Sequence, residues 1–200
     1  MPESDDREVL VAILAAGRAT RFGGGKLDAP LAGKPVGAWV LDAVAEADLA
    51  PGVIVSGPDR PDFVRGRAGW RAITNPDPSQ GLGSSVSLAI GEARKQGRDV
   101  LLLLADMPLI SPEHLCRLTA SSLNAATTWP EGRVGVPALI RRAFLEHLVG
   151  LRGDRGAGQH LADLEGLEIL SCPPELLIDI DCPEDLVRAS QLLERRQGGQ

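Results

Sequence analysis

The chain has 200 residues, of which 44% are hydrophobic and 24% charged, and its formal net charge is −6. These values are typical of a globular chain long enough to bury a substantial core, and they predict one domain over 1–200, with its core at about 8–195 and flexible ends. The negative charge and the aromatic content of only 3% argue against a surface that binds nucleic acid.

The cysteines and the N-terminus bear on where the protein resides. Cys116, Cys172 and Cys182 are odd in number and have no CxxC spacing, so neither a zinc site nor a disulfide framework is indicated. The first residues are acidic and lack the apolar stretch of a signal peptide, and no apolar run reaches the length of a membrane span. We therefore expect a cytoplasmic protein with reduced thiols and no membrane partner.

The first predicted element is a strand at 9–14, which is apolar and largely β-branched, as in a strand buried on both faces. Small residues follow it, and then Arg18, Arg21 and Lys26 alternate with glycines. Exposed backbone N–H groups flanked by cations suit a phosphate chain, although the spacing matches neither GxGxxG nor a Walker loop. A plain surface turn is the alternative, but three cations within nine residues favour a phosphate-binding loop.

The remaining elements alternate between helix and strand. Helices are predicted at 36–49, 86–97, 111–123, 141–149, 160–164 and 183–196, and strands at 53–57, 70–74, 99–105, 125–129, 133–139, 168–171 and 176–180. This order implies a single α/β domain with a Rossmann-like, mostly parallel but mixed sheet that helices cover on both faces.

Acidic residues follow two of the predicted strands, at the sheet edge where ligands of open α/β sheets bind. Asp106 ends the most apolar strand, whereas Asp179 and Asp181 alternate along a later one, so their side chains are expected on opposite faces. We expect Asp181, the nearer to the strand end, to join Asp106 in a Mg²⁺ site that faces the basic loop. The alternatives are a turn residue for Asp106 and a helix N-cap for Asp181.

Five segments resemble one enzyme family. LAAGRATRFGGGKL at 14–27 is similar to the LAAGxxxRMGxxK signature of nucleotidyltransferases, within them most to the molybdenum cofactor cytidylyltransferases of the MobA-like NTP transferase family. LADMP at 104–108 resembles the metal-binding element of that family, and DIDCPEDL at 179–186 resembles its DIDTPEDL segment. NPDPSQGLGSSVSLAI at 75–90 and GVPALIRRAF at 135–144 extend the likeness to nearly the whole chain.

The resemblance implies a Mg²⁺-dependent enzyme that transfers CMP from CTP to the phosphate of a molybdopterin-type cofactor, with release of pyrophosphate. It implies catalytic roles for Arg21, Lys26 and Asp106, and it places the metal on Asp106 and Asp181. The residues expected to contact the nucleotide are Leu14, Ala15, Ala16, Gly17, Arg21, Lys26, Ser56, Asn75, Gly81 and Ser84. An apo-molybdoenzyme is a possible partner for the product.

Two positions leave the substrate open. The methyl group of Ala16 narrows the space beside the base, which favours a pyrimidine and hence CTP. Gly158 stands where the similar GDxGARxLL segment has Arg, which puts the acceptor in doubt. A sugar phosphate or another small phosphate acceptor is therefore an alternative. Gly158 and Asp28 also leave open the alternative that the chain is a non-catalytic, chaperone-like nucleotide-binding protein. Ser84 and the adjacent Ser85 are equally well interpreted as caps of the next helix.

Overall fold

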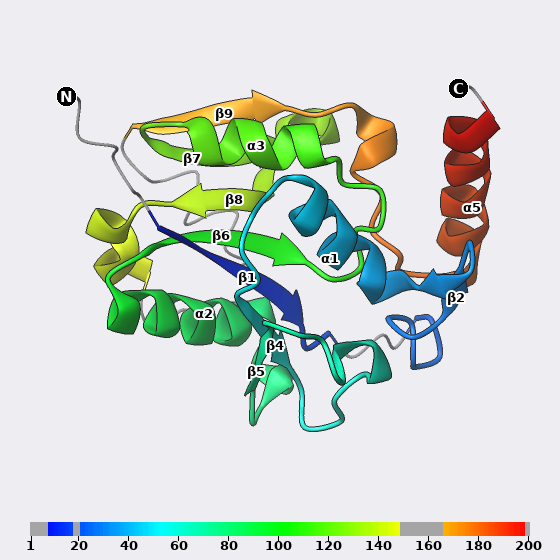
Figure 1. Ribbon diagram of the computed structural model, residues 1–200, viewed down its shortest axis with the longest axis horizontal. Coiled ribbons are helices and arrows are strands. Elements are labelled where there is room, and N and C mark those ends of the chain that lie inside the picture. The colour runs from blue at the N-terminus through cyan, green and yellow to red at the C-terminus, as the bar shows by residue number, and fades with distance from the viewer. Residues whose placement is uncertain (1–7, 18–20, 149–165, 199–200) are drawn as a thin grey trace.

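The computed structural model describes residues 8–17, 21–148 and 166–198 (Figure 1). Its main strands are β1 (Val9–Ala15), β4 (Val53–Ser56), β5 (Arg71–Thr74), β6 (Asp99–Leu104), β7 (Asn124–Thr128), β8 (Val134–Ile140) and β9 (Leu167–Ser171). Its α-helices are α1 (Val36–Glu46), α2 (Leu82–Gln96), α3 (Pro112–Ala120) and α5 (Pro183–Gly198). The short pieces are the hairpin β2 (Pro30–Leu31) and β3 (Lys34–Pro35) and the 3₁₀ helices η1 (Asp62–Val64), η2 (Pro78–Gln80), η3 (Pro130–Gly132), η4 (Arg142–Leu148) and η5 (Pro174–Leu176).

The main strands form one seven-stranded sheet in the order β5-β4-β1-β6-β8-β7-β9. The pairs β1–β4, β1–β6, β4–β5 and β7–β9 are parallel, whereas β8 runs antiparallel to both of its neighbours, β6 and β7. The predicted class, a mixed and mostly parallel α/β sheet, is confirmed. Because β1 and β6 are central and parallel, their carboxyl ends meet at one edge of the sheet.

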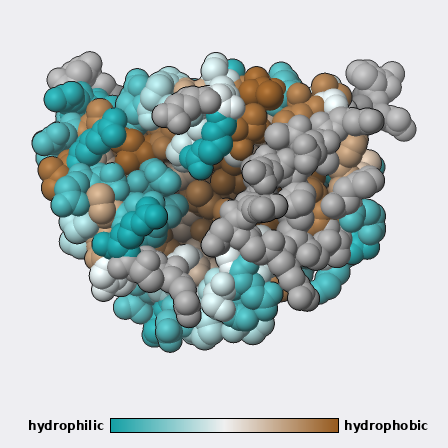
Figure 2. Space-filling view, turned by 180° about the vertical axis from the view of Figure 1, so that it is seen from behind, coloured by the Kyte–Doolittle hydropathy of each residue, from teal (hydrophilic) through white to brown (hydrophobic). Residues whose placement is uncertain are grey.

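The central strands are buried on both faces because each face has its own helical cover. Val11 and Ile13 of β1 pack in a cluster with residues of α1, α3 and α5, whereas Leu10, Ala12 and Leu14 pack in a second cluster with residues of α2 and η4. This alternation follows from the period of two along a strand. Seen from behind, hydrophobic residues lie across the middle of the surface and hydrophilic ones along its margins (Figure 2).

Most predicted elements are confirmed, and the largest error concerns 176–180. This segment is not a strand: Leu176 ends η5, and no regular structure follows until α5 begins. The physical reason is that β6 already has β1 and β8 on its two sides, so the segment has no free strand edge beside it. It instead crosses the carboxyl end of β6, where the Ile180 N–H donates to the Asp106 carbonyl oxygen at 2.9 Å.

Smaller differences from the predicted elements concern the helices. The predicted helix at 86–97 begins earlier, at Leu82, and 141–149 is largely the 3₁₀ helix η4. The helix predicted at 160–164 and the departure at Gly158 lie outside the described residues. No helix in the described ranges combines the length and the apolar character that a membrane crossing requires.

His114, in the first turn of α3, is buried and joins this helix to the sheet. Its Nε2 lies 2.8 Å from Thr127 Oγ1, and the Thr127 hydroxyl donates to the Pro137 carbonyl oxygen at 2.7 Å. Since the hydroxyl proton is committed to Pro137, His114 Nε2 must be the donor in the first bond. Its Nδ1 then carries a lone pair, and this buried atom has no partner among the described residues. Burial, together with the charge of Arg117, lowers the pKa of His114 to about 4.

This low pKa predicts that the protein loses stability on mild acidification. The unfolded chain takes up a proton near the ordinary pKa of 6.5, whereas the folded chain resists it until about pH 4, so the free energy of unfolding falls across this interval. The limiting slope for one proton is about 1.4 kcal/mol per pH unit. His114→Gln keeps a donor for Thr127 but cannot titrate, so urea unfolding between these pH values is expected to show a shallower dependence. Equal slopes in the two proteins would contradict the assignment.

Candidate active site

The glycine-rich loop owes its shape to three consecutive glycines. Gly23, Gly24 and Gly25 have φ angles of +86°, +98° and +64°, a region that residues with a Cβ rarely adopt. The Asp28 N–H donates to the Gly25 carbonyl oxygen at 3.0 Å and closes the next turn, while Leu27 is buried. The buried leucine and the turn fix the backbone on both sides of Lys26. This side chain therefore leaves the loop toward the carboxyl end of the sheet.

Lys26 meets the two predicted metal ligands at this edge. Its Nζ lies 2.6 Å from Asp106 Oδ2 and 3.3 Å from Asp181 Oδ1, and Lys26 is only 6% exposed. Arg21 Nη1 lies 3.5 Å from Asp181 Oδ2 but is itself largely exposed. The structure thus brings together all four charged residues that the sequence had selected, although the chain places them up to 160 positions apart. The basic loop and the acidic strand ends share one site.

The charges in this site stabilise one another. Burial alone would lower the pKa of Lys26, but the charges and hydrogen bonds of Asp106 and Asp181 outweigh it and raise the pKa above its usual value. The ammonium group therefore remains charged although it is buried. A buried cation of this kind needs its carboxylate partners, and each carboxylate needs the cation.

Asp179 is the site residue that the sequence argument set aside. Burial, and next the negative charge of Asp106, raise the pKa of Asp179, and the charge of Asp181 acts in the same direction. These couplings place Asp179 beside the same cluster. The period-two argument had directed it to the opposite face, but that argument requires a strand, and 177–182 is irregular. In the sequence, the repeated aspartate of the DID segment at 179–181 was the available signal that Asp179 also belongs to the site.

The carboxylate of Asp106 has room for a further positive partner. Its Oδ1 is buried and, among the described residues, has no hydrogen-bond partner, whereas Oδ2 binds Lys26. An unpartnered buried oxygen is costly unless a ligand completes it, so a hard cation fits this position. In the described part of the chain no three His, Cys, Asp or Glu side chains form a metal cluster. Mg²⁺ commonly takes one or two carboxylates with phosphate and water oxygens.

The predicted nucleotide contacts divide according to burial. Leu14 and Ala15 are buried in the core, so their side chains are unavailable and only their backbone remains for a ligand. Ala16 is half-buried and Gly17 is exposed, and both follow the end of β1. Ser56, paired with Ala15 at the end of β4, has a buried hydroxyl oxygen without a partner in the described ranges. Ala16, Gly17 and Ser56 therefore remain predicted nucleotide contacts.

Asn75 and Ser84 belong to a hydrogen-bond network that positions α2. The Asn75 amide donates to Ser84 Oγ at 2.8 Å and to Ser85 Oγ at 3.0 Å, while its own backbone N–H donates to the Ser56 carbonyl oxygen at 2.7 Å. The interpretation of the serines as helix caps is wrong, because α2 begins at Leu82 with Gly81, at φ +81°, in the capping position. The network fixes the N-terminus of α2 beside the ends of β4 and β5. Asn75 and Ser84 remain predicted nucleotide contacts.

Two aspartates have structural roles that bear on the alternatives. α5 begins at Pro183, so Cys182 and not Asp181 precedes the helix, and Asp185 Oδ2 in its first turn accepts hydrogen bonds from the Asp181 and Cys182 N–H groups at 3.0 Å and 2.9 Å. The N-cap interpretation of Asp181 is therefore wrong, and its side chain is free to meet Lys26. Asp28 accepts from the Asp62 and Phe63 N–H groups at 2.9 Å and 2.8 Å and holds η1. A structural role thus accounts for Asp28.

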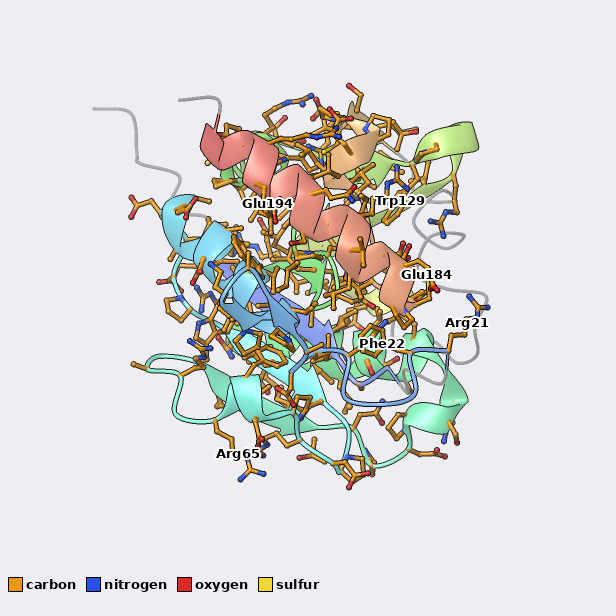
Figure 3. The ribbon with its side chains drawn as sticks, turned by 90° about the vertical axis from the view of Figure 1, so that its right-hand side faces the viewer. Arg21, Phe22, Arg65, Trp129, Glu184 and Glu194 are labelled. Atoms are coloured by element: carbon orange, nitrogen blue, oxygen red, sulfur yellow. The ribbon has the colours of Figure 1, made fainter. Side chains whose placement is uncertain are left out.

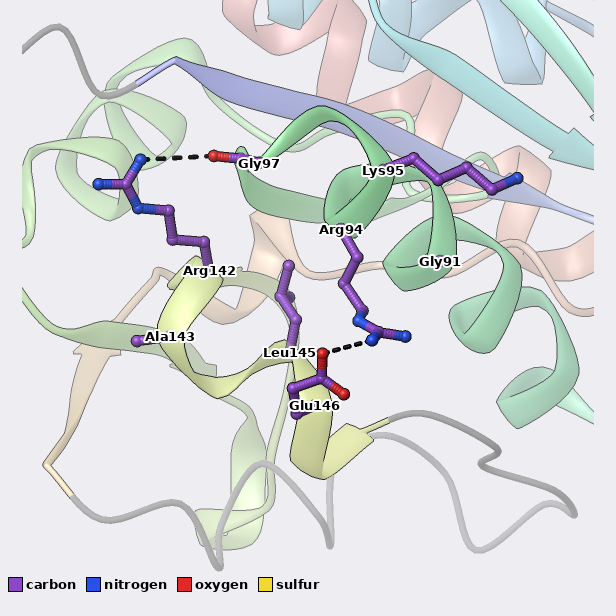
Figure 4. Close-up of a pocket in the computed structure, with 8 residues that line it drawn as sticks. All are labelled: Gly91, Arg94, Lys95, Gly97, Arg142, Ala143, Leu145 and Glu146. Atoms are coloured by element: carbon purple, nitrogen blue, oxygen red, sulfur yellow. Dashed lines mark hydrogen bonds and ion pairs between the residues drawn. The ribbon is translucent and has the colours of Figure 1, made fainter.

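A separate cavity of about 660 Å³ lies at the opposite edge of the sheet (Figure 4). It is bounded by the C-terminal turn of α2 and by η4, and Arg94 pairs with Glu146 across it. The Arg142 guanidinium donates to the Gly97 carbonyl oxygen at 3.4 Å. Because α2 leads into the start of β6, this cavity is far from the carboxyl ends where Lys26 and Asp106 meet. We do not place the chemistry there.

Comparisons with known proteins bear on the family and the fold of the chain. The MobA-like NTP transferase domain family matches residues 11–168. The purine catabolism protein PucB of Bacillus subtilis is 29% identical over 88% of this chain and 93% of its own. Rv0371c from Mycobacterium tuberculosis superposes with a TM-score of 0.77 at 22% identity, over 92% of this chain and 97% of its own, and its manganese complex with a TM-score of 0.71. The 4-diphosphocytidyl-2C-methyl-D-erythritol synthase of Anaerococcus prevotii has a TM-score of 0.71 at 15% identity, over 94% and 96%.

The charge cluster predicts a linked effect of Lys26 and divalent cations on stability. Lys26→Met removes the cation, which leaves Asp106 without its partner and Asp181 with only the exposed Arg21, and this is expected to cost about 3 kcal/mol and to lower the melting temperature by several degrees. Millimolar Mg²⁺ is expected to stabilise Lys26→Met more than the wild type, because the ion replaces the lost charge. Lys95→Met, at an exposed lysine outside the cluster, is the matched control. A Mg²⁺ response equal in all three proteins would contradict the site.

Proposed function

The chain belongs to the MobA-like NTP transferase family and is a nucleotidyltransferase, and from this premise we propose that it transfers CMP from CTP to the terminal phosphate of a molybdopterin-type cofactor, releasing pyrophosphate. The observation that carries the proposal is the contact of Lys26 with Asp106 at the carboxyl edge of the sheet. A basic loop and carboxylates with spare oxygen capacity are what a triphosphate and its counter-ion require.

The proposed reaction makes one bond and breaks one. An oxygen of the acceptor phosphate attacks the α-phosphorus of the nucleotide, and the bond from that phosphorus to the bridging oxygen of the β-phosphate breaks. Pyrophosphate leaves with the electron pair. The acceptor oxygen is already an anion, so no general base is required, and the charge that develops lies on the leaving pyrophosphate. The protein's task is therefore to position two phosphates and to neutralise charge.

Lys26 and Arg21 are the cations proposed for the β- and γ-phosphates. Lys26 is buried and held at the site by two carboxylates, so its charge is already in place before the nucleotide arrives. Arg21 is exposed and, among the described residues, pairs with Asp181 across 3.5 Å, so it can move toward a phosphate at little cost. Fixed positive charge near the leaving group lowers the barrier because it needs no rearrangement during the reaction.

Asp106 and Asp181 are the proposed Mg²⁺ ligands. The unpartnered Oδ1 of Asp106 supports this role, and Asp179 adds negative charge to the same position. The ion would supply neutralisation of the α-phosphate charge. A manganese complex of Rv0371c, a protein of similar fold, is consistent with a divalent cation here.

The nucleotide and acceptor assignments rest on finer features. Ala16 stands at the end of β1 with a methyl group that narrows the space beside the base, which supports CTP. A protein of similar fold from Anaerococcus prevotii is named for a diphosphocytidyl product. The non-catalytic alternative now has less support, because Asp28, one of the two residues that kept it open, has a structural explanation.

The function is tested by pyrophosphate release from each of the four ribonucleoside triphosphates, with molybdopterin present and absent. We expect release with CTP and molybdopterin together, and a loss of about 10²–10³-fold in kcat for Lys26→Ala and for Asp106→Asn. Lys95→Ala is the control, since this exposed lysine pairs only with the surface residue Glu92 among the described contacts. Pyrophosphate release with a sugar phosphate in place of molybdopterin would overturn the acceptor assignment, and no release with any acceptor would overturn the activity.

The proposed role of Ala16 predicts a change in base preference. Ala16→Gly removes one methyl group and enlarges the space beside the base, so kcat/KM for GTP relative to CTP is expected to rise about tenfold. Ile13→Val, which removes one methylene group in the buried core of β1, is the control for general loosening. An unchanged GTP-to-CTP ratio in Ala16→Gly would show that this residue does not read the base.

A further inference from the structure

The position of Lys26 depends on the residues that follow it. The three residues immediately before it are glycines, which have no side chains to anchor the loop. After it, the Asp28 N–H donates to the Gly25 carbonyl oxygen at 3.0 Å. The Ala29 N–H donates to the Lys26 carbonyl oxygen at 3.3 Å. Two overlapping turns thus contain Lys26, and Asp28 belongs to both, so a shift of Asp28 changes the direction in which the Lys26 side chain leaves the backbone.

The carboxylate of Asp28 joins these two turns to η1, which begins 34 positions further along the chain. The Asp62 N–H donates to Asp28 Oδ2 at 2.9 Å, and the Phe63 N–H donates to Oδ1 at 2.8 Å. Both oxygens are therefore engaged by the first N–H groups of η1, which have no partners within the helix itself. Hydrogen bonds to a carboxylate are stronger than those between neutral groups, and two of them fix its orientation as well.

Phe63 gives η1 a fixed position in the molecule. Its side chain is buried and packs over Gly37 in the first turn of α1, where an added Cβ would lie 2.6 Å from the ring. The Gly37 N–H in turn donates to the Leu27 carbonyl oxygen at 2.9 Å. η1, the start of α1 and the turns around Lys26 thus form a closed set of contacts, in which the Asp28 carboxylate links η1 to the turns.

η1 leads away from the charged residues of the site. In Figure 3, Arg21 and Phe22 of the glycine-rich loop lie near the start of α5, where Glu184 is labelled, whereas Arg65, directly after η1, lies at another end of the molecule. Because both oxygens of Asp28 are engaged by η1, this carboxylate is occupied without any ligand. An influence of Asp28 on the reaction therefore passes through the backbone that carries Lys26.

Resting on the proposed function, we propose that Asp28 is a positioning residue for nucleotidyl transfer: by binding η1, it holds Lys26 Nζ against Asp106 and Asp181, where the leaving pyrophosphate needs a cation. A lysine ammonium group sits on a flexible stem, so its position is only as well fixed as the backbone beneath it. A charge that must move during the reaction stabilises the transition state less than one already in place. Asp28 thus contributes to the rate without touching the nucleotide.

The test is a double-mutant cycle on kcat for pyrophosphate release, with wild type, Asp28→Ala, Lys26→Ala and the double variant. Asp28→Ala is expected to lower kcat about tenfold while Lys26 is present, with a smaller change in the KM for CTP. In the Lys26→Ala background the same change is expected to cause no further loss, because the group that Asp28 positions is already gone. A merely structural role of Asp28 would affect the two backgrounds equally.

Two further variants separate positioning from a general loss of folding. Asp28→Asn keeps one acceptor oxygen for η1, so it is expected to recover part of the loss in kcat that Asp28→Ala causes. Asp42→Ala is the matched control, because Asp42 is also half-buried but pairs with Lys34. It is expected to leave kcat unchanged in both backgrounds. The inference is overturned if Asp28→Ala lowers kcat by the same factor with and without Lys26, or does not lower it.

Urea unfolding of the four proteins of the cycle separates this inference from the proposed function. If Asp28 holds Lys26 on its carboxylates, the losses in the free energy of unfolding are expected to be non-additive. Pyrophosphate release with additive losses in kcat would leave the function standing and reject the positioning role. Non-additive unfolding, without pyrophosphate release from any triphosphate, would support the hold of Asp28 on Lys26 and reject the function. Additive unfolding without release would reject both.

Discussion

The buried ammonium group of Lys26 is the constraint on which the site depends. Asp106 and Asp181 both contact Lys26 where β6 ends, and their charges also act on Asp179, so these carboxylates repel one another unless a cation lies among them. Lys26 supplies that charge in the absence of substrate. In the proposed function, a metal–triphosphate complex would bring its own positive and negative charges to the same oxygens. The stability of this edge and its proposed binding of a nucleotide would then be two consequences of one balance of charge.

The fold supplies the rigidity that this balance requires. β1 and β6 are neighbours at the centre of the sheet, with every residue from Leu10 to Ala15 buried, so the loop after β1 and Asp106 after β6 start from fixed points. The segment 177–182 is irregular, but the Leu177 N–H bonds to Pro174 at its start, and the Ile180 N–H bonds to Asp106 near its end. Asp185 accepts from the last two N–H groups, so Lys26, Asp106 and Asp181 leave a backbone that is fixed by hydrogen bonds or by burial.

The side chains around the site have different structural roles. Asn75 fixes the start of α2 beside the ends of β4 and β5, and Asp28 fixes η1 beside the glycine-rich loop. These residues act through the backbone that they hold. Beyond the acidic segment, the Trp129–Arg133 pair and Arg188 line a cavity together with Asp179 and Asp185.

The sequence by itself determined the alternation of strands and helices, the glycine-rich basic loop, and the acidic residues expected to face it from the strand ends, because burial period, glycine content and strand-end charges are local signals. It did not determine which side of 177–182 each aspartate faces. That segment lies where β6 has no free edge, a fact of strand order that no local pattern contains. For the same reason, only the tertiary structure showed that Ser84 and Ser85 hold Asn75 instead of capping α2, and that Trp129 and Arg133 line the cavity beside Asp179. Contacts between distant segments depend on how the whole sheet is assembled, so they can be identified only in the folded structure.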